Sequence, residues 1–360
     1  MANPDEHELT YPLADARPQP GATIELADGV RWVRMPLPFA LDHINLWLLR
    51  DRLDGRDGWT VVDCGITDEA TRRAWEQVFA DELEGLPVLR VVVTHMHPDH
   101  VGLAHWLTQR FSDAGDGPEC RLWMSATDWN AARLSSQATT SFGGDSAATF
   151  FASHGLTDPD SLAKVRARSN YYGSMVPQVP TRFRRLMDGM ALHIGGHDWR
   201  CIAGYGHAPE HISLYCAALG LLISGDMVLP RISTNVSVID LEPEADPLTL
   251  YRRSIDRLAS MAAPDTLVLP SHGLPFRGLP ARVAQLHRHH EERLALVLKA
   301  CAHAPQSAAD LLPLLFRRQL DLHQTTFAIG EAIAHAHALW HGEQLARQRD
   351  TGGVWRFVPA

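Results

Sequence analysis

The chain has 360 residues, of which 45% are hydrophobic and 21% charged, and its formal net charge is −9 at pH 7. This composition is typical of a globular protein, and the negative charge argues against nucleic acid as a partner. No run of about 18 apolar residues predicts a membrane span. The five cysteines are scattered and form no CxxC pair, which argues against a disulfide framework or a thiolate metal site and favours a cytoplasmic location.

The N-terminal part predicts a leader followed by an α/β domain. Residues 1–20 are acidic and proline-rich, and we expect them to form a flexible leader. Short β-like runs (VRWVRM, INLWLLRD and WTVVDCG) then alternate with turns, and the apolar positions from Ala70 to Phe79 repeat at helical spacing. The run LRVVV predicts a buried strand that leads directly into a histidine-rich segment. This order indicates an α/β domain with its chemistry at the strand ends.

The rest of the chain predicts a helical insertion, further strands and a small C-terminal domain. Small polar residues mixed with helix-compatible pieces predict a mostly helical insertion over about 127–188. Strands resume in MALHIGG, DWRCIAG, ISLYCAA and GLLISGD, which is typical of an antiparallel meander, and TLVLPSHG predicts one more strand. From residue 281 we expect three helices and a last short strand, VWRFV. Ser307 and Asp310 would open the second helix as a capping box, and the third would cover about residues 323–348.

The segment Thr94-His95-Met96-His97-Pro98-Asp99-His100 follows the LRVVV strand directly. Residues two apart on extended backbone point the same way, so His95 and His97 can meet one metal together. Pro98 stops the strand, and Asp99 and His100 then turn toward a neighbouring position at the start of a helix. Imidazole and carboxylate groups suit zinc, and also iron or manganese.

Three further candidate ligands end other strand-like runs inside glycine-rich turns. They are His207 in GYGHAPEH, Asp226 in ISGDMV and His272 in LPSHGLP. Glycine beside each one lets the backbone turn sharply and approach closely. Any one of these residues alone would be read as structural, but their joint appearance at strand ends predicts a metal centre.

The motifs HMHPDH, GHAPEH, SGD and PSHG resemble, in this order, those of the metallo-β-lactamase superfamily over about residues 30–280. The C-terminal part resembles the winged-helix-like domain of a β-lactamase-like subgroup. The resemblance implies an αββα sandwich as a catalytic domain over 21–280 and a small winged-helix-like domain over 281–360. It also implies two divalent metal ions: one held by His95, His97 and His207, one held by Asp99, His100 and His272, and Asp226 bridging them.

The same resemblance implies roles for residues around the ligands. Asp63, in VVDCG, would orient a ligand imidazole, although a turn-forming aspartate after a strand is an equal alternative. His211, in GHAPEH, would likewise support the ligands, as a hydrogen-bond donor. Two metal ions roughly 3.5–4 Å apart can acidify a bridging water to hydroxide. Asp99 would orient this hydroxide and relay its proton, Asp226 would complete the catalytic pair, and no serine or cysteine nucleophile is required.

The substrate is less well specified, because related families include thioesterases, lactonases, β-lactamases and nucleases. We expect a small ester, thioester or lactone. A phosphodiesterase or endoribonuclease activity, supported only by Arg and His clusters such as 282–290, and a β-lactam hydrolase remain alternatives. Tyr171, Tyr172 and His43 are candidate substrate contacts, although helix packing explains the two tyrosines better. The C-terminal domain could instead serve dimerisation or partner docking, so a homodimer stays open.

Overall fold

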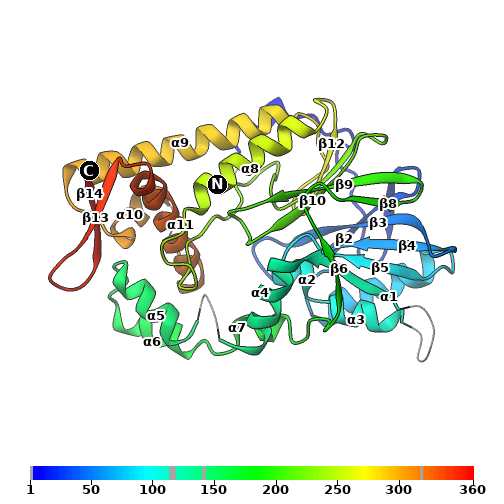
Figure 1. Cartoon of the computed structure of the whole chain (residues 1–360), viewed down its shortest axis with the longest axis horizontal. Helices are drawn as coiled ribbons and strands as arrows, with labels where there is room; N and C mark the ends of the chain where they lie inside the picture. The colour runs from blue at the N-terminus through cyan, green and yellow to red at the C-terminus, as the bar shows by residue number, and fades with distance from the viewer. Residues whose placement is uncertain (1–2, 113–118, 140–142, 317–318) are drawn as a thin grey trace.

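The computed structural model describes residues 3–112, 119–139, 143–316 and 319–360. Two β-sheets face each other at its centre, and helices cover both outer faces (Figure 1). Tryptophan side chains fill the space between the sheets: Trp32 and Trp47 from the first sheet pack with Trp199 from the second. This is the αββα sandwich expected from the sequence.

In the described ranges the first sheet has seven strands in chain order. Their pairing is antiparallel from β1 to β4 and parallel from β4 to β7. The strands are β1 (Thr23–Ala27), β2 (Val30–Pro36), β3 (His43–Leu53), β4 (Arg56–Val62), β5 (Val88–Val92), β6 (Arg121–Ser125) and β7 (Phe183–Leu186). Helices α1 (Glu69–Asp81) and α3 (Ala104–Arg110) cover its outer face, where Trp75 and Leu107 are buried against the strands.

The second sheet has five strands among the described residues, in the order β12-β11-β10-β9-β8. They are β8 (Ala191–Ile194), β9 (His197–Gly204), β10 (His211–Cys216), β11 (Leu221–Gly225) and β12 (Leu267–Pro270). Strands β8 to β11 form the predicted antiparallel meander, and β12 lies parallel to β11. Helix α8 (Pro247–Met261) connects β11 to β12 and buries Tyr251 and Ile255 against this sheet.

In its described residues the insertion between β6 and β7 is mostly helical up to Met175, as predicted. Its helices are α4 (Ala126–Gln137), α5 (Gly144–Ser153), α6 (Pro159–Ala167) and α7 (Tyr171–Met175). The expected range over 127–188 ends too late, because β7 lies inside it and pairs in parallel with β6. Helices α5 and α6 lie beside the C-terminal helices (Figure 1), and the His154 carbonyl accepts a hydrogen bond from the Ala309 N–H over 3.1 Å.

In its described residues the C-terminal part has three helices followed by a hairpin. It comprises α9 (Leu279–His303), α10 (Ala308–Leu315), α11 (Leu322–His341), β13 (Leu345–Arg349) and β14 (Trp355–Pro359). Ser307 and Asp310 form the predicted capping box of α10. The helix predicted over 323–348 is too long: α11 ends before Gly342, Glu343 takes a φ of 57°, and the next residues pair with β14.

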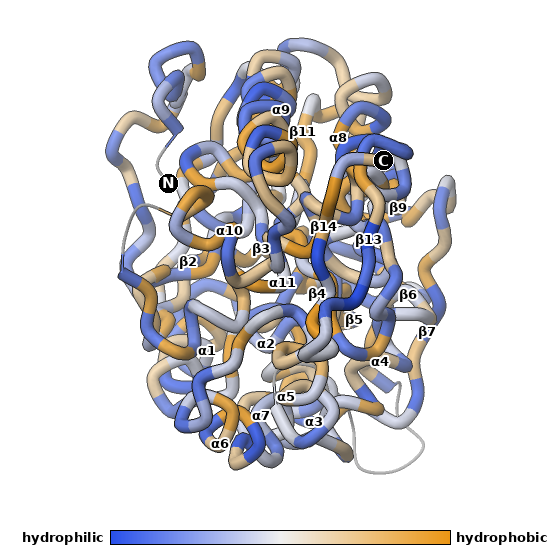
Figure 2. The backbone as a smooth tube through the Cα atoms, turned by 90° about the vertical axis from the view of Figure 1, so that its left-hand side faces the viewer, coloured by the Kyte–Doolittle hydropathy of each residue, from blue (hydrophilic) through white to orange (hydrophobic). Residues whose placement is uncertain are grey.

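The C-terminal helices share a hydrophobic core with the second sheet. Val297 of α9 and Ile333 of α11 belong to one buried cluster with Tyr251 of α8 and Val268 of β12. Hydrophobic and hydrophilic stretches alternate along α9, as expected for a helix with one buried side (Figure 2). The three helices therefore pack directly on the outer layer of the sandwich.

The N-terminal leader, expected to be flexible, is tied to the start of α9. The side-chain amide of Asn3 donates to Oε1 of Gln285 over 2.7 Å, and Thr10 and Arg277 exchange backbone hydrogen bonds. All five cysteines are buried and unpaired. Across the described ranges, no helix has the length and apolar character that crossing a membrane requires.

Candidate metal centre

The structure brings all seven predicted ligands to one edge of the sandwich. The HMHPDH segment follows β5 and enters the short helix α2 (Pro98–Val101), while the other three ligands follow β9, β11 and β12. Their side chains form two groups whose candidate ligand atoms lie within 4.8 Å of one another. The first group is His95, His97, His207 and Asp226, and the second is Asp99, His100 and His272.

Three imidazole nitrogens converge in the first group. Nε2 of His95 lies 2.9 Å from Nδ1 of His97 and 3.1 Å from Nε2 of His207. Nε2 of His207 lies 3.3 Å from Oδ2 of Asp226. Nitrogen and carboxylate donors gathered around one point are the donor set that tetrahedral zinc sites use.

Asp226 stands between the two groups. Its Oδ1 lies 3.4 Å from Nε2 of His272 and 3.6 Å from Nε2 of His100, while its Oδ2 faces His207. Asp99 joins the second group, with Oδ2 3.4 Å from Nε2 of His272. Within the described part of the chain, Oδ1 of Asp226 and Nε2 of His100 are buried without a hydrogen-bond partner. Buried polar atoms of this kind require a partner, so the donor set fits two divalent cations.

The second ring nitrogen of four histidines is held by the protein. These contacts join His100 Nδ1 to Asp63 Oδ2 at 2.8 Å, His207 Nδ1 to the Asn235 carbonyl at 2.8 Å, His272 Nδ1 to the His43 carbonyl at 2.8 Å, and His95 Nδ1 to Thr94 Oγ1 at 3.0 Å. Such contacts fix the tautomer and the orientation of an imidazole ring. The ring nitrogens that face the centre are thereby set before any ligand binds.

Asp63 occupies a strained position from which it holds the HMHPDH segment. Its backbone φ is 61°, in the left-handed region that non-glycine residues rarely adopt. Its Oδ1 accepts a hydrogen bond from the Thr94 N–H over 2.8 Å, and its Oδ2 contacts the Thr94 hydroxyl at 2.9 Å as well as His100. The carboxylate therefore does more than form a turn, and it positions His100 as the sequence suggests.

His211 contacts the metal centre in a different way from the one expected. Its Nε2 accepts a hydrogen bond from the backbone N–H of Asp226 over 3.2 Å, so it is an acceptor toward the backbone and not a donor to a ligand imidazole. Gly225 has a φ of 55°, and a Cβ there would lie 2.1 Å from Nε2 of His211. A glycine is needed at this position because the His211 ring occupies the space that a side chain would take.

The surroundings set the charge of each group. Burial and the neighbouring histidines hold the pKa of His95 well below its usual value, and burial together with His207 lowers the pKa of His97 to about 3. Burial opposes the charge of His272, but Asp226 and Asp99 outweigh it and raise its pKa to about 10. Burial likewise opposes the charge of Asp99, yet His100 and His272 lower its pKa to about 2. Neutral imidazoles and ionised carboxylates are the forms that bind metal, so His95, His97 and Asp99 are already in that form, whereas a metal ion at His272 would displace a proton.

The candidate substrate contacts divide into residues that face the centre and residues that support it. Tyr171 and Tyr172 line the cavity described below, but the Tyr172 hydroxyl already donates to the Met96 carbonyl. His43 does not line the cavity: its Nε2 accepts from the Gly273 N–H over 2.9 Å and its carbonyl holds His272. The expectation of a substrate contact is wrong for His43, whose side chain stabilises the loop after β12.

Sequence reasoning missed Asp128, at the start of α4. This carboxylate is fully buried, and burial raises its pKa to about 6 despite hydrogen bonds from the Met96 and Glu210 backbone. The sequence shows only Ser125 three residues before it, and Ser125 does cap α4 by accepting from the Asp128 N–H. A capping motif is common at helix starts, so it could not signal a contact with the metal centre.

A cavity of about 380 Å³ opens beside the metal centre, where His97, Asp99 and His207 line it. The rest of its wall is mostly apolar and comes from loops after β2 and β11, from the insertion and from α11. These wall residues include Leu37, Phe39, Leu41, Leu134, Tyr171, Tyr172, Met175, Ile239, Leu241 and Phe327. The arrangement places reactive groups at one end of an apolar pocket, as in most small-molecule sites.

Comparisons with known proteins agree with this arrangement. A model described as metallo-beta-lactamase superfamily matches residues 40–118 and 147–273, and a model described as metallo-beta-lactamase-like, C-terminal domain, matches residues 294–360. The chain is 25% identical over 329 residues to the probable metallo-hydrolase YqjP of Bacillus subtilis (strain 168), which covers 87% of this chain and 95% of the relative.

Solved structures show the same relationship. A beta-lactamase domain protein from Burkholderia ambifaria is 56% identical, with 99% of both chains covered and a TM-score of 0.91. A metallo-beta-lactamase family protein from Thermus thermophilus is 26% identical, with 93% of this chain and 100% of that chain covered and a TM-score of 0.72. The protein is a metal-dependent hydrolase, and its chain belongs to the metallo-β-lactamase superfamily.

Proposed function

We propose that this enzyme hydrolyses a neutral ester, thioester or lactone with a largely apolar acyl part, and that its two cations are zinc in preference to iron or manganese. The observation that carries the proposal is the apolar cavity that ends at His97, Asp99 and His207. Exposed apolar side chains around a cavity mark a surface that binds an apolar ligand. Three large hydrophobic residues on its wall are left exposed: Phe39 at 46%, Leu134 at 52% and Leu241 at 53%.

The charges around the cavity favour this substrate class over a phosphodiester or RNA. Among the described residues, neither lysine nor arginine lines the cavity, whereas a phosphate backbone is bound through such cations. Arg282, from the basic cluster considered above, is buried and donates to the Leu229 and Ile232 carbonyls. It stabilises the loop after β11 and does not face the cavity.

In this proposal His95, His97 and His207 hold one cation, Asp99, His100 and His272 hold the other, and Asp226 contacts both. When bound, the cations supply Lewis acidity, which lowers the pKa of a water molecule and polarises the substrate carbonyl. Asp99 also lines the cavity, and its low pKa keeps the carboxylate ionised. In this proposal Asp99 accepts a proton from the attacking water and passes it to the leaving group.

The test combines metal reconstitution with a substrate panel. Protein stripped with a chelator is reloaded with zinc, iron(II) or manganese(II), and metal content is measured by mass spectrometry. Each form is assayed with a p-nitrophenyl ester, an acyl thioester, a lactone, a cephalosporin, bis-p-nitrophenyl phosphate and a short RNA. We expect about two equivalents of metal and turnover of the ester, thioester or lactone, fastest with zinc. Turnover of only the phosphodiesters would overturn the proposal.

A matched pair of variants tests the apolar wall. Leu134→Lys places a charge in the cavity, and Leu296→Lys places one on the exposed side of α9, outside it. Each additional methylene of an acyl chain contributes about 0.8 kcal/mol on burial, so wild type should prefer an octanoate ester over a butyrate ester by at least about 10-fold. The Leu134 variant should lose this preference, and the Leu296 variant should keep it.

A further inference from the structure

A long loop without helix or strand joins β11 to α8 over residues 226–246. It begins with the ligand Asp226, and four of its side chains line the cavity beside the metal centre: Asn235, Ser237, Ile239 and Leu241. Loops of this length without secondary structure are uncommon in compact domains and usually have a function. Such a loop keeps one conformation only where other parts of the chain hold it.

Helix α9 holds the first part of this loop. Arg282 of α9 is only 4% exposed, and it donates from Nε to the Leu229 carbonyl over 2.6 Å and from Nη2 to the Ile232 carbonyl over 2.9 Å. Hydrogen bonds from an ionised donor are stronger than those between neutral groups. The buried guanidinium therefore ties this part of the loop to the C-terminal domain.

Helix α11 holds the second part of the loop, at Gly330. The backbone N–H of Val238 donates to the Gly330 carbonyl over 3.1 Å. A Cβ added at Gly330 would lie 2.8 Å from Cβ of Ser237, whereas carbon atoms in contact lie about 3.5–4.0 Å apart. Because a Cβ cannot rotate away from its own backbone, the loop can approach α11 this closely only where residue 330 has no side chain.

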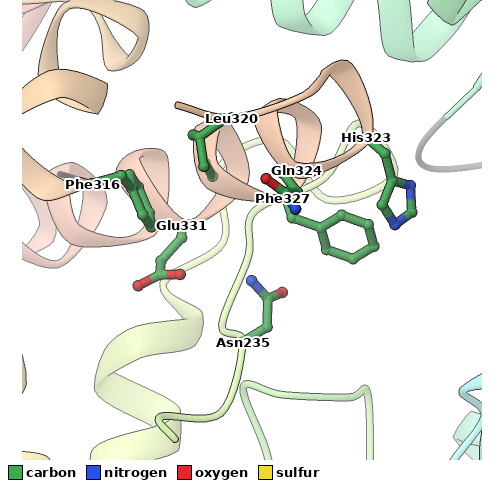
Figure 3. A pocket seen from close by; sticks show the side chains of 8 residues that line it. Asn235, Phe316, Leu320, His323, Gln324, Phe327 and Glu331 are labelled. Carbon is green, nitrogen blue, oxygen red and sulfur yellow. The ribbon is translucent and has the colours of Figure 1, made fainter. Parts of the chain in front are cut away.

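The loop held in this way orients a ligand of the first group. Figure 3 shows Asn235 on the loop, with its side chain extending toward α11 beside Phe327. The backbone carbonyl of Asn235 lies 2.8 Å from Nδ1 of His207, and its side-chain Oδ1 accepts from the Ser237 hydroxyl over 2.8 Å. A shift of the loop at Ser237 would therefore also move the carbonyl that fixes the His207 ring.

We propose that Gly330, in the C-terminal domain, is a positioning residue for the cation of the first group. Its missing side chain lets α11 hold the loop where the Asn235 carbonyl orients His207, although Gly330 itself does not contact the metal centre. The C-terminal domain is therefore needed to complete the metal centre. The inference rests on the cation site of the proposed function, and it does not depend on which substrate is hydrolysed.

The test measures zinc affinity in competition with a fluorescent chelator, from which two dissociation constants are obtained for wild type. His97→Ala removes a ligand of the first group and so identifies the constant that belongs to it. Loss of a group that orients a ligand imidazole weakens metal binding by about 10-fold to 100-fold. Gly330→Ala should therefore raise the constant of the first group by at least about 10-fold and leave the other within about 3-fold of wild type. Two wild-type constants in Gly330→Ala would overturn the inference.

A matched pair of double variants tests the contact with the loop. Ser237→Gly and Ser237→Ala both remove the hydroxyl, but only Ser237→Gly also removes the Cβ that would lie 2.8 Å from the methyl group added at Gly330. Combined with Gly330→Ala, Ser237→Gly should restore the constant of the first group to within about 3-fold of Ser237→Gly alone, whereas Ser237→Ala should not restore it. Equal constants in the two double variants would show that Gly330 does not act through this contact, and the inference would fail.

Two controls separate positioning from a general loss of stability. Gly352→Ala adds the same methyl group to the turn between β13 and β14, where the nearest atom would be Oδ1 of Asp350 at 3.3 Å, and it should bind zinc as wild type does. Urea unfolding of the zinc-free proteins checks that each variant is folded. Should Gly330→Ala fail to fold, Ser237→Val crowds the same contact from the loop and should raise the constant of the first group by at least about 10-fold. A wild-type constant in Ser237→Val would then overturn the inference.

The outcome also stays separate from that of the substrate panel, because zinc binding is measured without a substrate. If wild type turns over only phosphodiesters while Gly330→Ala loses zinc affinity at the first group alone, the proposed substrate class fails and the positioning role stands. If Gly330→Ala weakens both zinc sites equally, the positioning role fails, whatever the enzyme hydrolyses.

Discussion

Oδ2 of Asp128 accepts a hydrogen bond from the backbone N–H of Glu210 over 2.6 Å. The other carboxylate oxygen accepts from the Met96 N–H over 2.8 Å. Met96 belongs to the HMHPDH segment and Glu210 to the GHAPEH segment, so one buried carboxylate connects the two segments that form the first metal-binding group. The distance between their histidines therefore depends on a residue that contacts neither of them through its side chain.

Asp128→Asn should weaken this connection. An amide offers one acceptor and one NH₂ group, so one of the two backbone N–H donors would face another donor and lose its partner. A buried donor left without a partner costs on the order of 1–3 kcal/mol. We expect a lower free energy of unfolding by that amount in urea titrations, and a metal content below that of wild type after dialysis against a weak chelator. Asp160→Asn, on the exposed side of α6, is the control. A stable variant with full metal content would show that Asp128 does not set the distance between the histidines of the two segments.

Tyr172→Phe distinguishes a supporting role from a catalytic one. The hydroxyl of Tyr172 donates to the Met96 carbonyl, and burial holds its pKa well above the usual value, so it is a protonated, occupied donor. Removing it should cost about 1 kcal/mol of stability and change kcat by less than about 10-fold. Loss of a donor to a developing oxyanion would instead reduce kcat by about 10²–10³-fold. Steady-state kinetics with the best substrate of the panel decide between the two roles.

The ligand set was predictable because local sequence determines it. The HMHPDH segment follows β5 of the first sheet, and the other three ligands follow β9, β11 and β12 of the second sheet. These strand ends meet at one edge of the sandwich, so a motif and three residues after strands were enough to anticipate the cluster. The glycines beside the ligands are required by the fold: Gly206 has a φ of 99°, and a Cβ there would lie 2.2 Å from the Pro247 carbonyl. The apolar run LRVVV likewise predicted the strand β5, all of whose residues are buried.

Features that depend on tertiary contacts were not predictable. His43 shares a strand start with Asn45, and both side chains bind the loop after β12: Asn45 donates to the Pro270 and Gly273 carbonyls. Nothing local distinguishes a residue that supports this loop from one that faces the substrate. The cavity beside the metal centre likewise depends on α11, whose Phe327 lines it together with Asn235, nearly a hundred residues earlier in the chain.

His97→Ala should remove the metal bound by the first group while the fold survives. His97 is only partly buried, and its Nδ1 contributes one of three imidazole nitrogens to this group. We expect metal content to fall by at least one equivalent and kcat/KM to drop by more than about 100-fold, with an unchanged far-ultraviolet circular dichroism spectrum. His193→Ala, with a side chain 69% exposed on the second sheet, should match wild type. An active His97→Ala enzyme would place the metal elsewhere.

The buried imidazole of His335 should make the protein less stable in acid, independently of the metal centre. It is buried on α11, its Nδ1 donates to the Glu331 carbonyl, and His290 and Arg293 of α9 face it. Burial, and then Arg293, lower its pKa to about 4, below the value of about 6.5 expected in the unfolded chain.

Because the pKa of His335 is lower in the folded state, the unfolded chain binds a proton between these two values that the folded protein does not. Protonation of His335 therefore does not lower the free energy of unfolding above pH 6.5. As the pH drops toward 4, it lowers this free energy by up to about 1.4 kcal/mol per pH unit. His335→Gln removes that contribution, so the stability difference between wild type and variant in urea titrations with chelator should shrink from pH 7 to pH 5. Thr325→Gln, on the same helix, adds no titrating group, so its free energy of unfolding should change with pH as that of wild type does. If the free energy of unfolding of the His335 variant had the same pH dependence as that of wild type, His335 would have to be protonated inside the fold.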